Sequence, residues 1–362
     1  MHLVIFQLDP AAPWIAENRA VTPEKLEQLR ADPDQMDLRR RWTMFTELVA
    51  AAFRAAGWRV DLAPTDRWAI TAEAADGTGA DLVFAPHTTR MQFGPTRTPM
   101  LFYMQMMQRW LFTVDPLGWG AGAASYPCSA YAQGDADAPT FALYRERIVN
   151  RNTSKFAQAP KRSRIDLVRN SAIPDAPYIF FPCQVPHDES LKLFSPYAEE
   201  ALVGALAEWC AARGVWLVLK EHPANRPSMR ALHAAADRHA RTLWSEASIH
   251  DLIEHAAAVY TLNSGVGFEA LLHLKPVATF ARAEYDVVAV RGEIDILDTV
   301  WQAVSSWDRT EWSHRYSQFI DWYCRMHAVD LSAGPTERAN RLERLVAQAT
   351  EIASGPSEER TT

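Results

Sequence analysis

The sequence predicts an α/β protein with two Rossmann-like domains that face one another across a cleft. Three observations predict this fold class. Short apolar segments typical of buried strands alternate with longer helical segments along the chain. The length of 362 residues exceeds the usual size of a single core. Several apolar segments also stop abruptly at polar residues, and ligands bind at such strand ends in open parallel sheets.

The N-terminal half contains three expected strands, at residues 2–8, 58–64 and 81–87. A mostly helical pattern covers residues 23–58 between the first two of them. The segment 98–113 is rich in aromatic and methionine residues and fits either a helix or a strand, because short apolar segments are ambiguous by period.

The C-terminal half repeats this rhythm, with helical segments between expected strands at residues 178–184, 215–223, 242–246, 258–264 and 276–281. A basic, weakly apolar segment at 145–169 precedes the first of these strands and marks the expected domain boundary. The predicted organisation is an N-terminal Rossmann-like domain at 1–170, a C-terminal Rossmann-like domain at 171–305, helices at 306–352 that pack across both domains, and a disordered tail at 353–362.

The composition excludes several classes of protein. A net charge of −7 argues against a nucleic-acid-binding protein. The N-terminus lacks the basic region of a signal peptide, and no run of about 18 apolar residues predicts a transmembrane helix. The four cysteines show no CxxC spacing, which favours buried free thiols. We therefore expect a cytoplasmic protein whose membrane contact, if any, is peripheral to the inner membrane.

The first polar strand end reads LVLKEHP and carries Lys220 and His222. Pro223 cannot continue a strand ladder, so the chain must turn and present His222 at the carboxyl end of the strand. The imidazole can donate a hydrogen bond to a phosphate oxygen, and the lysine adds positive charge. The alternative is a histidine that only stacks on its loop.

The second motif, NSGVGFEALLHL, joins a strand to a helix. Asn263 and Ser264 favour the N-cap position, and Gly265 and Gly267 allow the backbone to approach a ligand closely. Since a helix N-terminus attracts anions, we expect a phosphate there. Glu269 lies in the first turn, where it either accepts hydrogen bonds from ribose or only complements the helix dipole.

The third motif, FPCQVPHDES, places Gln184 and Asp188 after a fully apolar segment. A carboxylate at such a strand end faces the expected cleft. Three roles are open for Asp188: a nucleophile, a general base, or the cap of the following helix.

Together these motifs resemble those of the bacterial capsule polysaccharide proteins that act as retaining β-Kdo glycosyltransferases. The segments PCQVPHDES, KEHP and NSGVGFEALLHLKPV match that family in order and spacing, and the resemblance covers residues 178–285. It implies the two-domain GT-B fold, with 1–170 as the acceptor-side domain and 171–305 as the nucleotide-sugar-binding domain. It also implies CMP-Kdo as the donor, and no metal or other cofactor.

The resemblance also implies residue roles. Asp188 stands at the position of the catalytic carboxylate, which attacks the anomeric carbon. The implied donor-binding residues are Gln184, Lys220, His222, Asn263, Ser264, Gly265 and Glu269. Of these, Lys220, His222 and Ser264 would hold the CMP phosphate, and Glu269 the ribose. Attack by a carboxylate divides a retaining transfer into two inversions, and cations with a helix dipole stabilise the leaving phosphate without a metal.

On the acceptor side, Asp115 is the expected acid. It lies in TVDPLGWGAG, the nearest counterpart of a family segment that reads EDGFLRS, whose glutamate and arginine have no match here. The implied acceptor is a glycan or glycolipid. The basic segment 145–169 would contact an anionic membrane or acceptor, or would serve only as a solvated linker.

Other functions share the same phosphate chemistry. One is the transfer of a polyol phosphate from a CDP donor, and another is a UDP-sugar epimerase of the same two-domain shape. A third is an inactive relative that binds a nucleotide without turnover. The identity of the bound nucleotide separates the first two from a CMP-sugar transferase.

Overall fold

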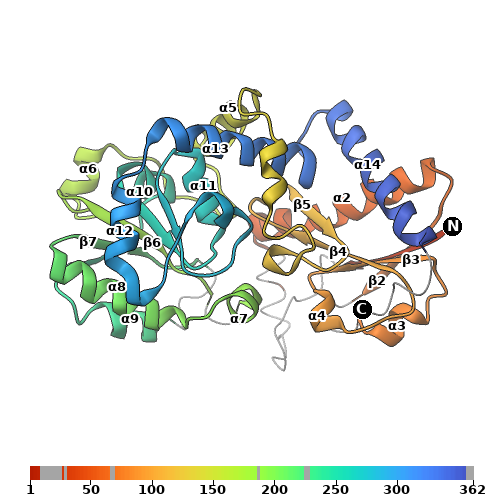
Figure 1. Ribbon diagram of the computed structural model, residues 1–362, viewed down its shortest axis with the longest axis horizontal. Coiled ribbons are helices and arrows are strands. Elements are labelled where there is room, and N and C mark those ends of the chain that lie inside the picture. The colour runs from red at the N-terminus through yellow and green to blue at the C-terminus, as the bar shows by residue number, and fades with distance from the viewer. Residues whose placement is uncertain (9–26, 28–30, 66–69, 186–187, 224–228, 356–362) are drawn as a thin grey trace. The chain divides into compact units, whose positions relative to one another are not determined.

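The computed structural model describes residues 1–8, 27, 31–65, 70–185, 188–223 and 229–355. The chain divides into two compact units. Unit 1 contains Met1–Tyr126 and Tyr323–Thr362, and unit 2 contains Pro127–Trp322. Each unit is a layered α/β structure, which confirms the predicted fold class (Figure 1).

The described part of unit 1 contains a six-stranded sheet in the order β12-β5-β4-β3-β1-β2. Its strands are β1 (His2–Leu8), β2 (Arg59–Thr65), β3 (Leu82–Pro86), β4 (Met100–Gln105), β5 (Leu111–Asp115) and β12 (Val329–Asp330). The first four are parallel, whereas β5 and β12 are antiparallel to their neighbours. The ambiguous segment 98–113 is therefore an antiparallel strand pair.

Helices cover both faces of this sheet. On one face, Phe45 of α2 (Pro33–Ala55) stacks on Phe112 with ring centroids 4.5 Å apart, and α14 (Pro335–Ser354) packs against α2. On the other face, Val83 and Phe102 form a core with α3 (Ala72–Asp76) and α4 (Arg90–Phe93). Consecutive residues of the strands thus supply the two cores alternately.

The described part of unit 2 contains a second six-stranded sheet, in the order β11-β10-β9-β6-β7-β8 and parallel throughout. Its strands are β6 (Tyr178–Pro182), β7 (Trp216–Lys220), β8 (Thr242–Trp244), β9 (Ala258–Thr261), β10 (Val277–Thr279) and β11 (Val290–Arg291). All expected strands of the C-terminal half are present.

Alternation along β6 again divides the helices between two faces. Ile179 and Phe181 share a core with α8 (Glu199–Arg213), α9 (Arg230–Ala236) and α12 (Leu297–Ser305). Tyr178 points to the other face and donates its hydroxyl to the Leu252 carbonyl oxygen at 2.7 Å. That face carries α10 (Ile249–His255) and α11 (Gly265–Leu272); the other helices of unit 2 are α5 (Thr140–Arg145), α6 (Arg164–Arg169), α7 (Glu189–Phe194) and α13 (Arg309–Asp321).

The predicted domain boundary at residue 170 differs from the division into units. The segment 127–170 belongs to unit 2 because α10 and α11 satisfy its polar groups. Arg145 donates to the Leu272 carbonyl oxygen at 2.7 Å, and the Arg162 amide donates to Asp251 at 3.0 Å. The basic segment is thus packed structure, not a solvated linker.

The helices predicted at 306–352 are also divided between the units. Helix α13 belongs to unit 2, whereas residues from Tyr323 onward, including α14, return to unit 1. Most of the tail predicted as disordered, 353–362, lies outside the described residues.

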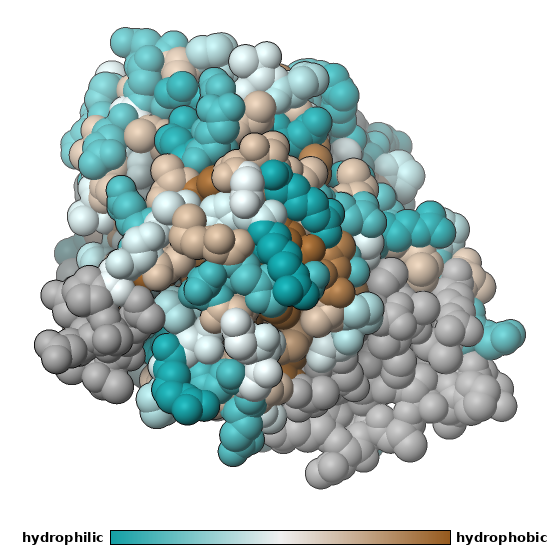
Figure 2. Space-filling view, turned by 90° about the vertical axis from the view of Figure 1, so that its right-hand side faces the viewer, coloured by the Kyte–Doolittle hydropathy of each residue, from teal (hydrophilic) through white to brown (hydrophobic). Residues whose placement is uncertain are grey.

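The surface in Figure 2 is mostly hydrophilic, with a small area of hydrophobic side chains. Among the described residues, none of the helices combines the length and the hydropathy that a membrane span requires. All four cysteines are buried and none forms a disulfide, as the sequence predicts.

We expect Gly134→Ala to destabilise unit 2. A Cβ atom at Gly134 would lie 2.0 Å from the Gln318 carbonyl oxygen of α13, and this backbone atom cannot move aside cheaply. The expected loss is about 1–3 kcal/mol, measured as a lower thermal unfolding midpoint. Gly204→Ala in α8 is the control, because its Cβ atom would make an ordinary 3.7 Å contact with Ala235. Equal midpoints for the two variants would contradict this account.

Candidate functional site

The three sequence motifs of unit 2 meet at one edge of its sheet. Strand β6 lies between β7 and β9, and the chain order reverses at β6, since β7 and β8 extend to one side and β9 to the other. Ligands of open α/β sheets bind at the carboxyl ends of strands beside such a reversal. Gln184 follows β6, Lys220 ends β7, and Asn263 follows β9.

Gln184 and Asn263 join two of these strand ends through reciprocal hydrogen bonds. The Gln184 side-chain amide donates to the Asn263 side-chain oxygen at 3.0 Å, and the Asn263 backbone amide donates to the Gln184 side-chain oxygen at 3.2 Å. The Asn263 side chain also donates to the Ser190 carbonyl oxygen at 3.0 Å, which holds α7 against the same edge. Both predicted residues thus shape the site.

Glu199 is a residue of this edge that the sequence analysis missed. It is buried in the first turn of α8, and its Oε1 accepts the Gln184 backbone amide at 2.6 Å. Its Oε2 is buried without a hydrogen-bond partner among the described residues. Burial raises the pKa of Glu199 to about 8, against the lowering effect of the Gln184 hydrogen bond. A glutamate in the first turn of a helix is common on surfaces, so the sequence carries no signal for this role.

Asp188 caps α7 and lies near His222. Its side chain is exposed and accepts the Ser190 backbone amide at 2.8 Å, so the capping role is real. Burial lowers the pKa of His222 to about 4, the charge of Asp188 acts to raise it, and the charge of Lys155 lowers it further. His222 is therefore neutral at pH 7, where it can donate a hydrogen bond but carries no charge.

Ser264 caps α11, as predicted, and accepts the Val266 amide at 3.3 Å. The hydroxyl of buried Tyr285 donates to the Ser264 carbonyl oxygen and fixes this helix start, of which Gly265 is the first residue. The prediction for Gly267 needs correction. A Cβ atom there would lie 2.3 Å from the Tyr285 hydroxyl, so the close approach that requires glycine is to Tyr285 and not to a ligand.

Glu269 is buried in α11, and the Ser154 hydroxyl donates to its Oε1 at 2.7 Å. Two residues further on, the Phe156 ring lies edge-on to the His222 imidazole with centroids 4.9 Å apart. The segment that the sequence suggested as a linker thus reaches two of the predicted donor residues. Only tertiary structure reveals this, because nothing in the local pattern of 151–163 indicates a ligand.

Asp115 lies at the end of β5 in unit 1. It is buried and accepts backbone amides from Leu117, Gly118, Ala124 and Ser125 at 2.7 to 3.3 Å. These bonds give Asp115 a structural role, because they close the glycine-rich loop after β5. A catalytic role for it stays a prediction.

A protein-family model matches the part of the chain that contains these motifs. Residues 137–309 match the family model for capsule polysaccharide biosynthesis proteins, a range that includes all three motifs of unit 2. The match covers slightly less than half of the chain. Over this segment it agrees with the capsule polysaccharide family that the motifs predict.

Individual relatives of this chain are distant. Protein FixF of Sinorhizobium fredii is 29% identical over 180 residues, which cover 48% of this chain and 40% of FixF. The capsule polysaccharide export protein KpsS of Escherichia coli is 32% identical over 100 residues, which cover 26% of this chain and 25% of KpsS. The matches thus span less than half the length of either relative.

A solved structure also aligns with this chain. Thermosulfurimonas dismutans KpsC, described as a beta Kdo 2,7 transferase, aligns with a TM-score of 0.49 at 16% identity. The alignment covers 83% of this chain and 96% of the KpsC chain.

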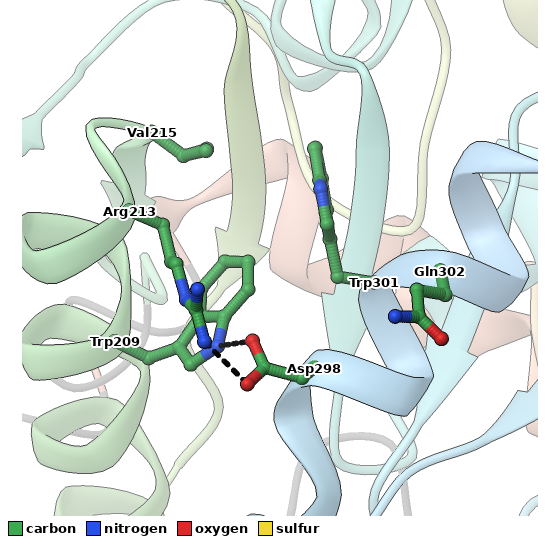
Figure 3. A pocket seen from close by; sticks show the side chains of 6 residues that line it. All are labelled: Trp209, Arg213, Val215, Asp298, Trp301 and Gln302. Carbon is green, nitrogen blue, oxygen red and sulfur yellow. Dashed lines mark hydrogen bonds and ion pairs between the residues drawn. The ribbon is translucent and has the colours of Figure 1, made fainter.

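A separate crevice of about 360 Å³ lies between α8 and α12 (Figure 3). Trp209 and Arg213 extend from α8 to Asp298 of α12, with a Trp209 Nε1 to Asp298 Oδ1 distance of 2.9 Å. Arg213 and Val215 precede β7, so the crevice lies at the amino ends of the strands, away from the three motifs. In this crevice Trp209 and Arg213 bind Asp298 and so join α8 to α12.

As the pH rises from 4.5 to about 8, we expect the free energy of unfolding of the parent to decrease relative to that of Glu199→Gln. The folded state holds the Glu199 proton more tightly than the unfolded state, so stability from this group is complete below pH 4.5 and is lost as the pH approaches 8. The expected slope is about 1.4 kcal/mol per pH unit. Denaturant titrations at several pH values measure it.

The matched control is Glu208→Gln, an exposed glutamate on the same helix, which should keep the parent's slope. Parallel curves for the parent and Glu199→Gln would show that Glu199 is ionised in the folded protein.

Proposed function

We propose that this protein is a glycosyltransferase that transfers Kdo from CMP-Kdo, with retention of configuration, to a glycan or glycolipid acceptor. The observation that carries the proposal is the junction of β6, β7 and β9. There an exposed carboxylate, Asp188, lies within electrostatic reach of His222, beside the capped start of α11. A carboxylate next to an anion-binding edge suits the displacement of a phosphate from a sugar.

In the proposed first step, a carboxylate oxygen of Asp188 attacks the anomeric carbon of the donor. The bond from that carbon to the phosphate oxygen breaks, and its electron pair leaves with CMP. The neutral His222 would donate a hydrogen bond to the phosphate, and the amide groups at the start of α11 would supply a positive dipole end.

In the second step, an acceptor hydroxyl displaces the Asp188 carboxylate from the sugar, and the proton of the hydroxyl passes to an ionised acceptor-side carboxylate. Two inversions restore the original configuration. Gln184 and Asn263 would keep the strand ends at a fixed spacing throughout. Lys220 at the end of β7 would add charge at the phosphate, and Glu269 would contact the ribose. Asp115 is our proposal for the acceptor-side acid.

We expect CMP to raise the thermal unfolding midpoint clearly more than CDP, UMP or UDP. Ligand binding stabilises a protein by RT ln(1 + [L]/Kd), which is about 2.7 kcal/mol at a hundredfold excess over Kd. A thermal-shift series at equal nucleotide concentrations measures the order. Strongest stabilisation by CDP would favour a polyol-phosphate transferase, and strongest stabilisation by UDP would favour an epimerase.

We expect Asp188→Asn to abolish sugar transfer while CMP affinity and stability stay close to those of the parent. An amide is a poor nucleophile, yet its oxygen can still accept the Ser190 amide that caps α7. Asp188→Ala should also be inactive and should lose about 1 kcal/mol of stability, because it removes the cap. Transfer by Asp188→Asn at the parent's rate would reduce Asp188 to a cap and turn the search to Glu189.

A further inference from the structure

Hydrogen bonds hold the segment 152–162 against the start of α10. The Ser248 hydroxyl donates to the Asn152 side-chain oxygen, and the Ile249 amide donates to the Gln158 side-chain oxygen at 3.0 Å. Between these anchors, the His250 Nε2 lies 2.7 Å from the Thr153 carbonyl oxygen. The backbone is therefore held on both sides of residues 154–156.

A second histidine, His273, fixes the position of His250. Its Nδ1 lies 3.0 Å from the Nε2 of His273, and the two imidazole rings stack in the interior of unit 2. Burial lowers the pKa of both histidines, so the pair stays neutral and keeps its hydrogen bonds near pH 7. The position of the segment 152–162 is thus set by buried groups.

Lys155 lies between two residues that contact the candidate donor site. Its predecessor, Ser154, donates to Glu269, and its successor, Phe156, packs on His222. The charge of Lys155 also acts on the His222 imidazole. These contacts place the backbone of residue 155 near the carboxyl ends of the strands, and the charge of Lys155 is within electrostatic reach of His222.

We propose that Lys155 is a phosphate-binding residue of the donor site and that the segment 152–158 forms one of its walls. The inference rests on the proposed function, because the phosphate is that of the CMP-sugar. A neutral His222 can donate a hydrogen bond to the phosphate but adds no charge, so a cation beside it would help to balance the phosphate. A lysine provides a strong point charge for a phosphate. When the sugar–phosphate bond breaks, negative charge builds up on CMP, and Lys155 stabilises it.

The decisive comparison uses CMP and cytidine, which differ only in the phosphate. Isothermal titration of the full chain should show Lys155→Met binding CMP on the order of 10- to 100-fold more weakly than the parent, with cytidine affinity unchanged. Lys155→Arg should recover most of the CMP affinity. The control is Lys161→Met, an exposed lysine of the same segment whose charge acts on His250 and not on His222.

An independent readout is the titration of His222 by NMR. Removing a neighbouring cation should raise the pKa of His222 in Lys155→Met and leave it unchanged in Lys161→Met. Unchanged CMP affinity in Lys155→Met overturns the inference. Equal losses for CMP and cytidine also overturn it, since they indicate a structural role.

The same variants separate this inference from the proposed donor. If the parent binds UMP or inorganic phosphate better than CMP, the CMP-sugar assignment fails. Weaker binding of that better ligand by Lys155→Met then still supports the phosphate role of Lys155. If the parent binds none of the three probes, both proposals fail.

Discussion

The reciprocal hydrogen bonds between Gln184 and Asn263 are the interaction on which the site depends. They connect the ends of β6 and β9 at the point where the chain order of the sheet reverses. Asn263 extends this connection to α7, and the Gln184 backbone extends it to buried Glu199. Because the members of such a network fix one another, the loss of one would release α7, with its cap Asp188, and the start of α11 from a common geometry.

Much of the fold follows from local patterns. The five strands expected in the C-terminal half read as apolar segments that end in proline or polar residues, and each of these five is present. The ambiguity of residues 98–113 has a physical basis, since a buried antiparallel pair and a buried helix have the same apolar composition. The expected boundary near 170 differs from the division into units, because a basic segment need not be exposed to solvent. Arg145 and Arg162 instead bond to α10 and α11, which are distant in sequence.

The residues of the candidate site also fall into two groups, those that local sequence predicts and those that depend on tertiary contacts. Ser264 and Asp188 are caps, and capping is a local property that sequence reveals. Glu199, Ser154 and Phe156 act through contacts with residues far along the chain, so no motif identifies them. Gly267 shows a limit of motif interpretation, because the glycine is explained by Tyr285. Asp115 shows a second limit of motif interpretation. A buried carboxylate can have a structural role, because it accepts hydrogen bonds from the backbone amides of the loop that follows it.

The return of residues 323–362 to unit 1 has a consequence for biosynthesis. Unit 2 is continuous in the chain, whereas unit 1 lacks β12 and α14 until all of unit 2 has been translated. The usual order, in which the N-terminal domain folds first on the ribosome, is therefore reversed. Until β12 and α14 have been translated, the edge of β5 and one side of α2 stay uncovered. An unpaired strand edge of this kind is prone to aggregate.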